Sequence, residues 1–146
     1  MMKKSRSNCP LTSALDIIGD KWSLIIIRDL FLGKKTFTEF VNSKEKIATN
    51  ILSNRLELLT SYDIVNVTKL PNDQKAKIYY LTDSGIDLYP IIYEMMYWSR
   101  RNLKKEFGPI GKKILLEAEG KSAESFILDT TEDYKCIRQG IFNQLN

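Results

Sequence analysis

Residues 47–59 read IATNILSNRLELL, and their spacing predicts the helix around which the fold is organised. The apolar residues recur at intervals of three and four and share one helical face: Ile47, Ile51, Leu52, Leu56 and Leu59. A second face carries short polar side chains: Thr49, Asn50, Ser53 and Asn54. Its composition is unusual, because each Asn, Ser or Thr costs up to about 0.7 kcal/mol relative to Ala in a helix.

The second face indicates a specific partner. Short side chains that both donate and accept hydrogen bonds can approach base edges in the major groove of DNA. We therefore predict base contacts from Thr49, Asn50, Ser53 and Asn54. Asn in particular suits bidentate contact with N6 and N7 of adenine. A solvated face without any partner is the alternative, and the neighbouring segments bear on the choice.

The segments before this helix predict three more helices. The first begins at Pro10, which is tolerated in a first helical turn, and ends at Gly19 with Asp20. The second covers SLIIIRDLFL and closes at Gly33; it is apolar on most sides and belongs at the centre of the core, with a strand over LIII as the alternative. The third, TFTEFV, has a capping-box spacing from Thr36 to Glu39.

The segments after it predict a hairpin and further helices. Residues 64–70 and 77–81 alternate as strands, and residues 71–76 form the turn. Thr82 is the expected N-cap of a long helix, in which Pro90 marks either a kink or the junction of two helices. Two more helices follow Gly108 and Pro109. We expect a mainly α protein with a small β-hairpin, a winged helix-turn-helix (α+β), with additional C-terminal helices. Residues 1–105 would form the DNA-binding unit, including the long helix, and residues 106–146 a C-terminal extension.

Composition excludes several other classes of protein. The chain has 146 residues, 43% of them hydrophobic, and a net charge of +4, which permits nucleic-acid binding without demanding it. It has no histidine, the commonest general base and metal ligand, and only two distant cysteines. We expect no enzyme activity, no metal and no cofactor. Neither a membrane span nor a signal peptide is evident, so we expect a cytoplasmic protein.

Three stretches resemble the HxlR-type (MarR-like) bacterial transcription regulators: CPLTSALDIIGDKWSLIIIRDLFLGKKTFTEF, IATNILSNRLELL and YYLTDSGIDLYPIIYEMMYW. The match covers about residues 9–100. It implies a homodimer on a palindromic double-stranded DNA operator, with one recognition helix (about residues 48–60) in each half-site and the wing (about residues 65–82) on the backbone. It also implies a dimer contact between the N-terminal segment and the long helix, for which we select Pro10, Leu11, Ile91, Met95 and Trp98.

The chain departs from the family pattern at four positions. Thr36 replaces an Arg, and Val67 replaces another Arg in the first wing strand. Ala48 replaces a Ser, which moves the expected N-cap to Thr49. Asp63 replaces a Gly, and Asp tolerates the left-handed conformation better than most residues.

Basic residues on both sides of the recognition helix are candidates for phosphate contacts. We select Lys34, Lys35, Thr36, Arg55, Lys69, Lys75 and Lys77. Any single lysine has the alternative of being an ordinary surface residue. Arg55 has the alternative of packing on the domain and pairing with an acidic neighbour such as Glu39.

Cys9 is a candidate redox sensor. It stands just before Pro10, where a helix N-terminus would lower the pKa of its thiol, and Lys3, Lys4 and Arg6 add positive charge. In some HxlR-type members the Cys at this position senses oxidants or electrophiles. The alternative for Cys9 is a small buried thiol that packs at the interface. Cys136 is expected to be structural filler, unless it pairs with Cys9 across the dimer.

The function that we predict is sequence-specific regulation of transcription, with a small-molecule or oxidant signal as a further partner. A winged-helix module that binds another protein is the alternative.

Overall fold

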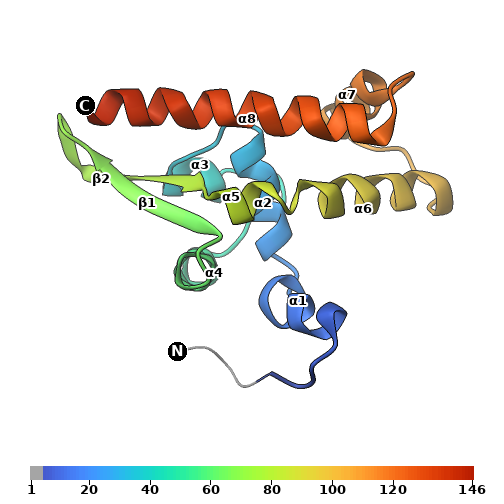
Figure 1. The fold of residues 1–146 in the computed structure, drawn as a ribbon, viewed down its shortest axis with the longest axis horizontal. Helices are drawn as coiled ribbons and strands as arrows, with labels where there is room; N and C mark the ends of the chain where they lie inside the picture. The colour runs from blue at the N-terminus through green and yellow to red at the C-terminus, as the bar shows by residue number, and fades with distance from the viewer. Residues whose placement is uncertain (1–4) are drawn as a thin grey trace.

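The computed structural model describes residues 5–146 and shows a layered helical protein with one β-hairpin (Figure 1). Its elements are α1 (Pro10–Ile18), α2 (Ser23–Phe31), α3 (Phe37–Val41), α4 (Thr49–Ser61), β1 (Val65–Leu70), β2 (Asp73–Leu81), α5 (Asp83–Ile86), α6 (Tyr89–Asn102), α7 (Pro109–Ala118) and α8 (Ala123–Leu145). The predicted fold class is confirmed. None of the helices in residues 5–146 combines the length and the apolar character that a membrane span requires.

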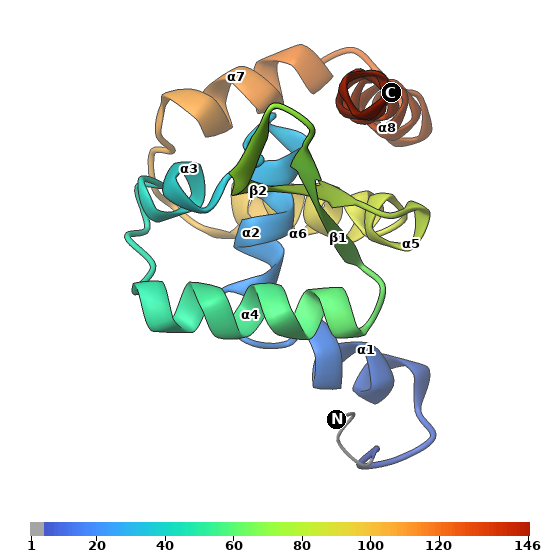
Figure 2. The same ribbon diagram turned by 90° about the vertical axis from the view of Figure 1, so that its left-hand side faces the viewer.

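Helix α2 lies at the centre of the core, as its apolar sequence predicts. Ile26, Ile27 and Leu30 are no more than 2% exposed. Helix α4 lies on one side of α2, and α8 lies on the other side, as Figures 1 and 2 both show. The core therefore joins the predicted DNA-binding unit to the C-terminal extension, since Phe126 and Tyr134 of α8 pack in the same cluster.

Local signals place several helix ends correctly. The Thr36 hydroxyl accepts the amide N–H of Glu39, and the Thr82 hydroxyl accepts that of Gly85. Gly33, with φ of 96°, follows the end of α2 in the left-handed region. Of the two alternatives at Pro90, a kinked helix or two helices, the structure shows two helices. Helix α5 ends before α6 begins, and Pro90 lies in the first turn of α6.

Two details of α4 differ from expectation. Its N-cap is Ala48, which is extended and has no side-chain capping bond, so the predicted N-cap at Thr49 is wrong. The carbonyl of Ala48 already accepts the amide of Leu52, so the helical turn has begun before Thr49 could cap it. Ile51, expected in the core, is 37% exposed because it lies at the border of the apolar face.

The hairpin pairs β1 with β2 in antiparallel register from Val65 opposite Leu81 to Lys69 opposite Lys77. Strand β2 begins at Asp73, earlier than the predicted 77, because the turn is short and the register shifts after Lys69. At the start of β2, the Asp73 carboxylate accepts hydrogen bonds from the backbone amides of Lys75 and Ala76, at 3.2 and 3.3 Å. The predicted left-handed residue before β1 is confirmed, since Asp63 has φ of 57°.

A candidate nucleic-acid interface

Helix α4 presents its short polar side chains to solvent. Its buried face is anchored by Leu52, Leu56 and Leu59, each no more than 3% exposed. Because these leucines fix the rotation of the helix, the opposite face must point outward. All four predicted base-contact residues are exposed: Thr49, Asn50, Ser53 and Asn54. The structure thus brings them together on one accessible surface.

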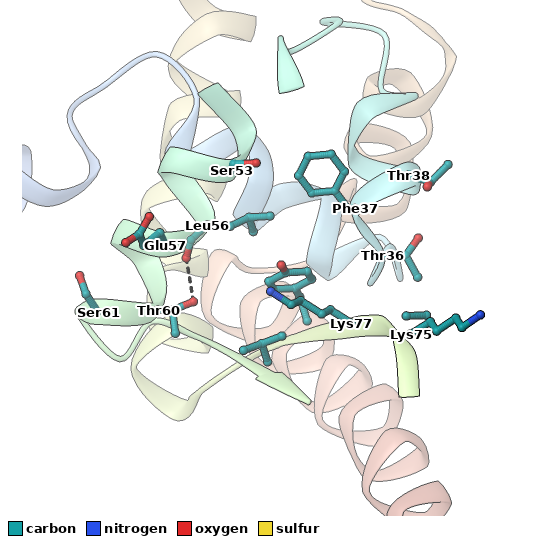
Figure 3. A pocket seen from close by; sticks show the side chains of 13 residues that line it. Thr36, Phe37, Thr38, Ser53, Leu56, Glu57, Thr60, Ser61, Lys75 and Lys77 are labelled. Atoms are coloured by element: carbon teal, nitrogen blue, oxygen red, sulfur yellow. Dashed lines mark hydrogen bonds between the residues drawn. The ribbon is translucent and has the colours of Figure 1, made fainter. Parts of the chain in front are cut away.

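A cleft of about 810 Å³ separates α4 from the hairpin (Figure 3). Ser53 and Glu57 line it from α4, and Lys75 and Lys77 line it from β2. Phe37, the first residue of α3, also lines the cleft. The cleft therefore has Ser53 of the polar face on one wall and two lysines of the wing on the other.

The lysines of the wing are available for an anionic partner. Lys69, Lys75 and Lys77 are exposed, and Lys35 is half-buried. In the part of the chain that the structure describes, none of these four ammonium groups forms an ion pair. Surface charges without partners can exchange counterions for phosphates.

Two other predicted phosphate contacts are engaged inside the protein. The Lys34 ammonium lies 2.8 Å from the Ser43 hydroxyl and 3.6 Å from the carboxylate of buried Asp29. The Thr36 hydroxyl caps α3 and donates to the Glu39 carboxylate at 2.9 Å. These contacts position the turn between α3 and α4.

The Asp29 carboxylate is the centre of this arrangement. It is 2% exposed and accepts hydrogen bonds from the Ser43 hydroxyl and from Arg28, the latter at 2.8 Å. Arg28 also holds Glu45 at 2.8 and 3.0 Å. Hydrogen bonding to Arg28 lowers the pKa of Glu45 and outweighs the opposing effect of burial.

Arg55 does pair with an acidic residue, but its partner is Asp20 rather than Glu39. Its Nη1 lies 3.3 Å from an Asp20 oxygen, and both side chains are 25% exposed. Asp20 also accepts the amides of Trp22 and Ser23, at 3.0 and 2.9 Å, where α2 begins. Burial alone would raise the pKa of Asp20, but bonds from the Ser23 hydroxyl and the two amides, with the Arg55 charge, lower it.

Sequence reasoning missed Ile51 as a candidate for DNA contact. It is an exposed apolar residue next to Asn50 on the outward side of α4. An apolar side chain in the major groove can contact the methyl group of thymine. Its position at the edge of the apolar stripe was the available signal.

Cys9 is the N-cap residue of α1 and is exposed, which disfavours the buried-thiol alternative within one chain. The amide of Thr12, then its hydroxyl and the amide of Leu11, lower the pKa of the Cys9 thiol. Arg6 pairs with Asp16 instead of facing the thiol, while Lys3 and Lys4 lie outside the described residues. Cys136 is exposed on α8, so it does not fill the core.

The predicted dimer residues form exposed apolar surface on α1 and α6. Leu11 is 66% exposed, Met95 and Trp98 are each 54% exposed, and Ile91 is 38% exposed. Pro10 is exposed at the start of α1. Large apolar side chains repeated along one helix face commonly mark a protein–protein contact.

The fold, the exposed α4 and the wing define the family, and a family model described as HxlR-like helix-turn-helix matches residues 17–107. This chain belongs to the HxlR family. Its fold is that of the winged-helix transcription regulators, among them reduced YodB. Helices α7 and α8 follow the matched region.

Two relatives illustrate the similarity in sequence. Rv3095 of Mycobacterium tuberculosis, an uncharacterized HTH-type transcriptional regulator, is 30% identical over 96 residues; these make up 66% of this chain and 60% of Rv3095. This HxlR-type chain therefore spans about three fifths of that relative's length. YodB of Bacillus subtilis, also an HTH-type transcriptional regulator, is 34% identical over 92 residues, which cover 62% of this chain and 82% of YodB.

Solved structures support the same assignment. Reduced YodB superposes with a TM-score of 0.57 at 30% identity, covering 69% of this chain and all of YodB. The redox regulator HypR, in its oxidized form, superposes with a TM-score of 0.59 at 33% identity, covering 66% of this chain and all of HypR. YodB has also been solved in a quinone-bound form.

Proposed function

We propose that this HxlR-type regulator binds duplex DNA sequence-selectively as a homodimer, with α4 in the major groove and the hairpin on the backbone. One observation carries the proposal: the exposed polar face of α4 and the exposed wing lysines flank a single cleft. Ser53 lies on the first wall, and Lys75 and Lys77 lie on the second. A protein–protein module would have no need of this pairing of short polar side chains with unpaired lysines.

The side chains divide into two roles. Asn50, Ser53, Asn54 and Thr49 are assigned to base edges, and Thr49 has its hydroxyl available because Ala48 is the N-cap. Lys69, Lys75, Lys77 and Lys35 are assigned to phosphates. Lys34, Thr36 and Arg55 are given positioning roles first, because their polar groups already contact the protein.

Fluorescence anisotropy with duplexes from the region upstream of the protein's own gene tests this proposal. Replacing Lys75 and Lys77 by Gln should weaken binding to all sequences and reduce the salt dependence by roughly one unit of slope per lost contact. Asn50→Ala should instead reduce discrimination between operator and non-operator DNA. Replacing Lys112 and Lys113 of α7 together by Gln is the charge-matched control. Binding that is absent or insensitive to salt would favour the protein–protein module.

The dimer is supported by the apolar surface on α1 and α6 described above. A two-fold dimer would carry two copies of α4 and could therefore match a palindromic site with half-sites about one helical turn apart. Trp98 and Met95 of each chain would be buried at its centre. Helix α8 of the extension packs on the core of its own chain through Phe126 and Tyr134.

We also propose that modification of Cys9 by an oxidant or electrophile regulates DNA binding. The support is its exposure, its N-cap position, the lowered pKa of its thiol, and the description of the similar protein HypR as a redox regulator. Diamide or a quinone should change the affinity of the unmodified protein but not that of Cys9→Ser. Cys136→Ser is the matched control and should respond like the unmodified protein. Equal responses from all three proteins would contradict this role.

A further inference from the structure

Arg55 holds the side-chain amide of its neighbour Asn54 on the exposed face of α4. Its Nη2 lies 2.6 Å from Oδ1 of Asn54, and its Nε lies 3.2 Å from the same atom. The guanidinium is restrained from the other side by Asp20, whose oxygen lies 3.3 Å from Nη1. Asp20 is itself immobilised by the amides at the start of α2. Arg55 therefore links Asp20, in the loop before α2, to Asn54, which is a predicted base-contact residue.

The chemistry of this contact determines which way the Asn54 amide is turned. A guanidinium has only donors, so the amide atom that faces it must be the oxygen. Two N–H groups from one edge of the Arg55 guanidinium, Nε and Nη2, converge on this oxygen and hold it toward Arg55. Asn54 is left with the two N–H donors of its amide nitrogen and no acceptor for a base.

Asn50, one turn earlier on the same face, is different. It is exposed, and within residues 5–146 its side-chain amide makes no hydrogen bond to the protein. Asn50 therefore keeps both a donor and an acceptor. The two asparagines of α4 look equivalent in the sequence but present different hydrogen-bonding groups to DNA.

We infer that Asn54 reads hydrogen-bond acceptors only, and that Arg55 is the positioning residue that imposes this specificity; the inference rests on the proposed DNA binding. In the major groove, adenine presents the N7 acceptor beside the N6 donor, so bidentate contact needs an amide with its oxygen available. Guanine presents two acceptors, N7 and O6. The base opposite Asn54 is therefore guanine, whereas Asn50 retains the capacity to read adenine.

Selection of bound duplexes from a randomised pool, with the unmodified protein and with Asn54→Ala, identifies the position that Asn54 reads. This exposed substitution should not disturb folding. Guanine is expected there, and replacing it with adenine should weaken binding of the unmodified protein by about tenfold, within the range for a good base contact. Replacing it with 7-deazaguanine, which lacks the N7 acceptor, should also weaken binding. An adenine at this position whose N6 amino group contributes to affinity would overturn the inference.

Arg55→Ala provides the second arm, with circular dichroism to establish that it is folded. Freeing Oδ1 of Asn54 should reduce the preference for guanine over adenine at that one position by at least severalfold, and leave the position read by Asn50 unchanged. An unchanged ratio in a folded Arg55→Ala protein would overturn the inference. The comparison of guanine, adenine and 7-deazaguanine duplexes tests the inference with the unmodified protein, even if Arg55→Ala does not fold. If the unmodified protein shows no sequence selectivity, the proposed function is overturned together with the inference. If it binds selectively but prefers a base other than guanine at this position, only the inference is overturned.

Discussion

The hydroxyl of Tyr134 accepts a hydrogen bond of 2.7 Å from the backbone amide of Leu81, which joins the C-terminal helix to the base of the wing. Both residues are buried, at 2% and 0% exposure. Arg138, one turn further along α8, donates to the Leu81 carbonyl at 3.1 Å and to Asp83 at 2.8 Å. Helix α8 lies beyond the residues that match the family model, yet it completes the core and supports the strand that carries the wing lysines.

Tyr134→Phe should lower the free energy of unfolding by about 1–3 kcal/mol, because the Leu81 amide would remain buried without an acceptor. Urea unfolding followed by circular dichroism measures the change. Tyr80→Phe is the matched control, since the Tyr80 ring stacks edge-on against Phe142 and its hydroxyl makes no hydrogen bond among the described residues. That control should change stability by less than about 0.5 kcal/mol. Equal effects of the two substitutions would contradict the role given to the Tyr134 hydroxyl.

Asp29→Ala should destabilise the protein by about 2–3 kcal/mol, because the Ser43 hydroxyl and the Lys34 ammonium lose their buried carboxylate, while Arg28 keeps Glu45. Thermal unfolding is the measurement. Glu45→Gln removes the more exposed carboxylate of Arg28 and should cost no more than about 1 kcal/mol. A mild effect of Asp29→Ala would show that the network does not hold the turn before α4.

Trp98→Glu should convert the proposed homodimer into monomers, because it places a charge at the centre of the apolar stripe on α6. Sedimentation equilibrium measures the mass, and affinity for a duplex with two half-sites should fall together with it. Ile137→Glu on α8 is the control, since Ile137 is 40% exposed and lies next to Arg138, which contacts the base of the wing. A monomeric unmodified protein, or a dimer that survives Trp98→Glu, would place the contact elsewhere.

Alkylation of Cys9 by iodoacetamide, measured in a Cys136→Ser background, should have its pH midpoint below the ordinary cysteine value of about 8.5. The Thr12 amide makes the largest contribution to the lowered pKa, followed by the Thr12 hydroxyl. Thr12→Val should therefore raise the midpoint. Ser13→Ala should not, because the Ser13 hydroxyl bonds to the Cys9 carbonyl instead of the thiol. A midpoint at or above the ordinary value would remove the chemical basis of the switch.

Acid should destabilise the fold through Asp20 and Glu45, whose pKa values are both lowered in the folded protein. A carboxylate with a lowered pKa contributes stability above its unfolded pKa, about 3.9 for Asp and 4.3 for Glu, and loses it as the pH falls through the folded value. Urea midpoints should therefore drop below about pH 4. The double variant with Asp20→Asn and Glu45→Gln should show a flatter profile, and an identical profile would assign acid sensitivity to other groups.

Features that depend on near neighbours along the chain follow from the sequence alone. The apolar spacing of residues 47–59 specified which side of α4 is buried, because the period of a helix is a local property. Thr36 and Thr82 specified helix starts because each caps an amide three residues away. Local rules are less decisive where neighbouring residues compete for one position. The N-cap of α4 is Ala48, and the prediction of Thr49 is wrong.

The tertiary structure, by contrast, sets which polar groups of the chain already have partners within it. The partners of Lys34, Arg55 and Tyr134 are Ser43, Asp20 and Leu81, all brought near by packing of the core. Tyr134 and Leu81 are 53 residues apart, and no periodicity relates them. A hydrogen bond needs its two atoms within about 3 Å at the right angle. Such distances between remote residues are set by how the apolar faces pack together, so the pattern of a single helix cannot specify them.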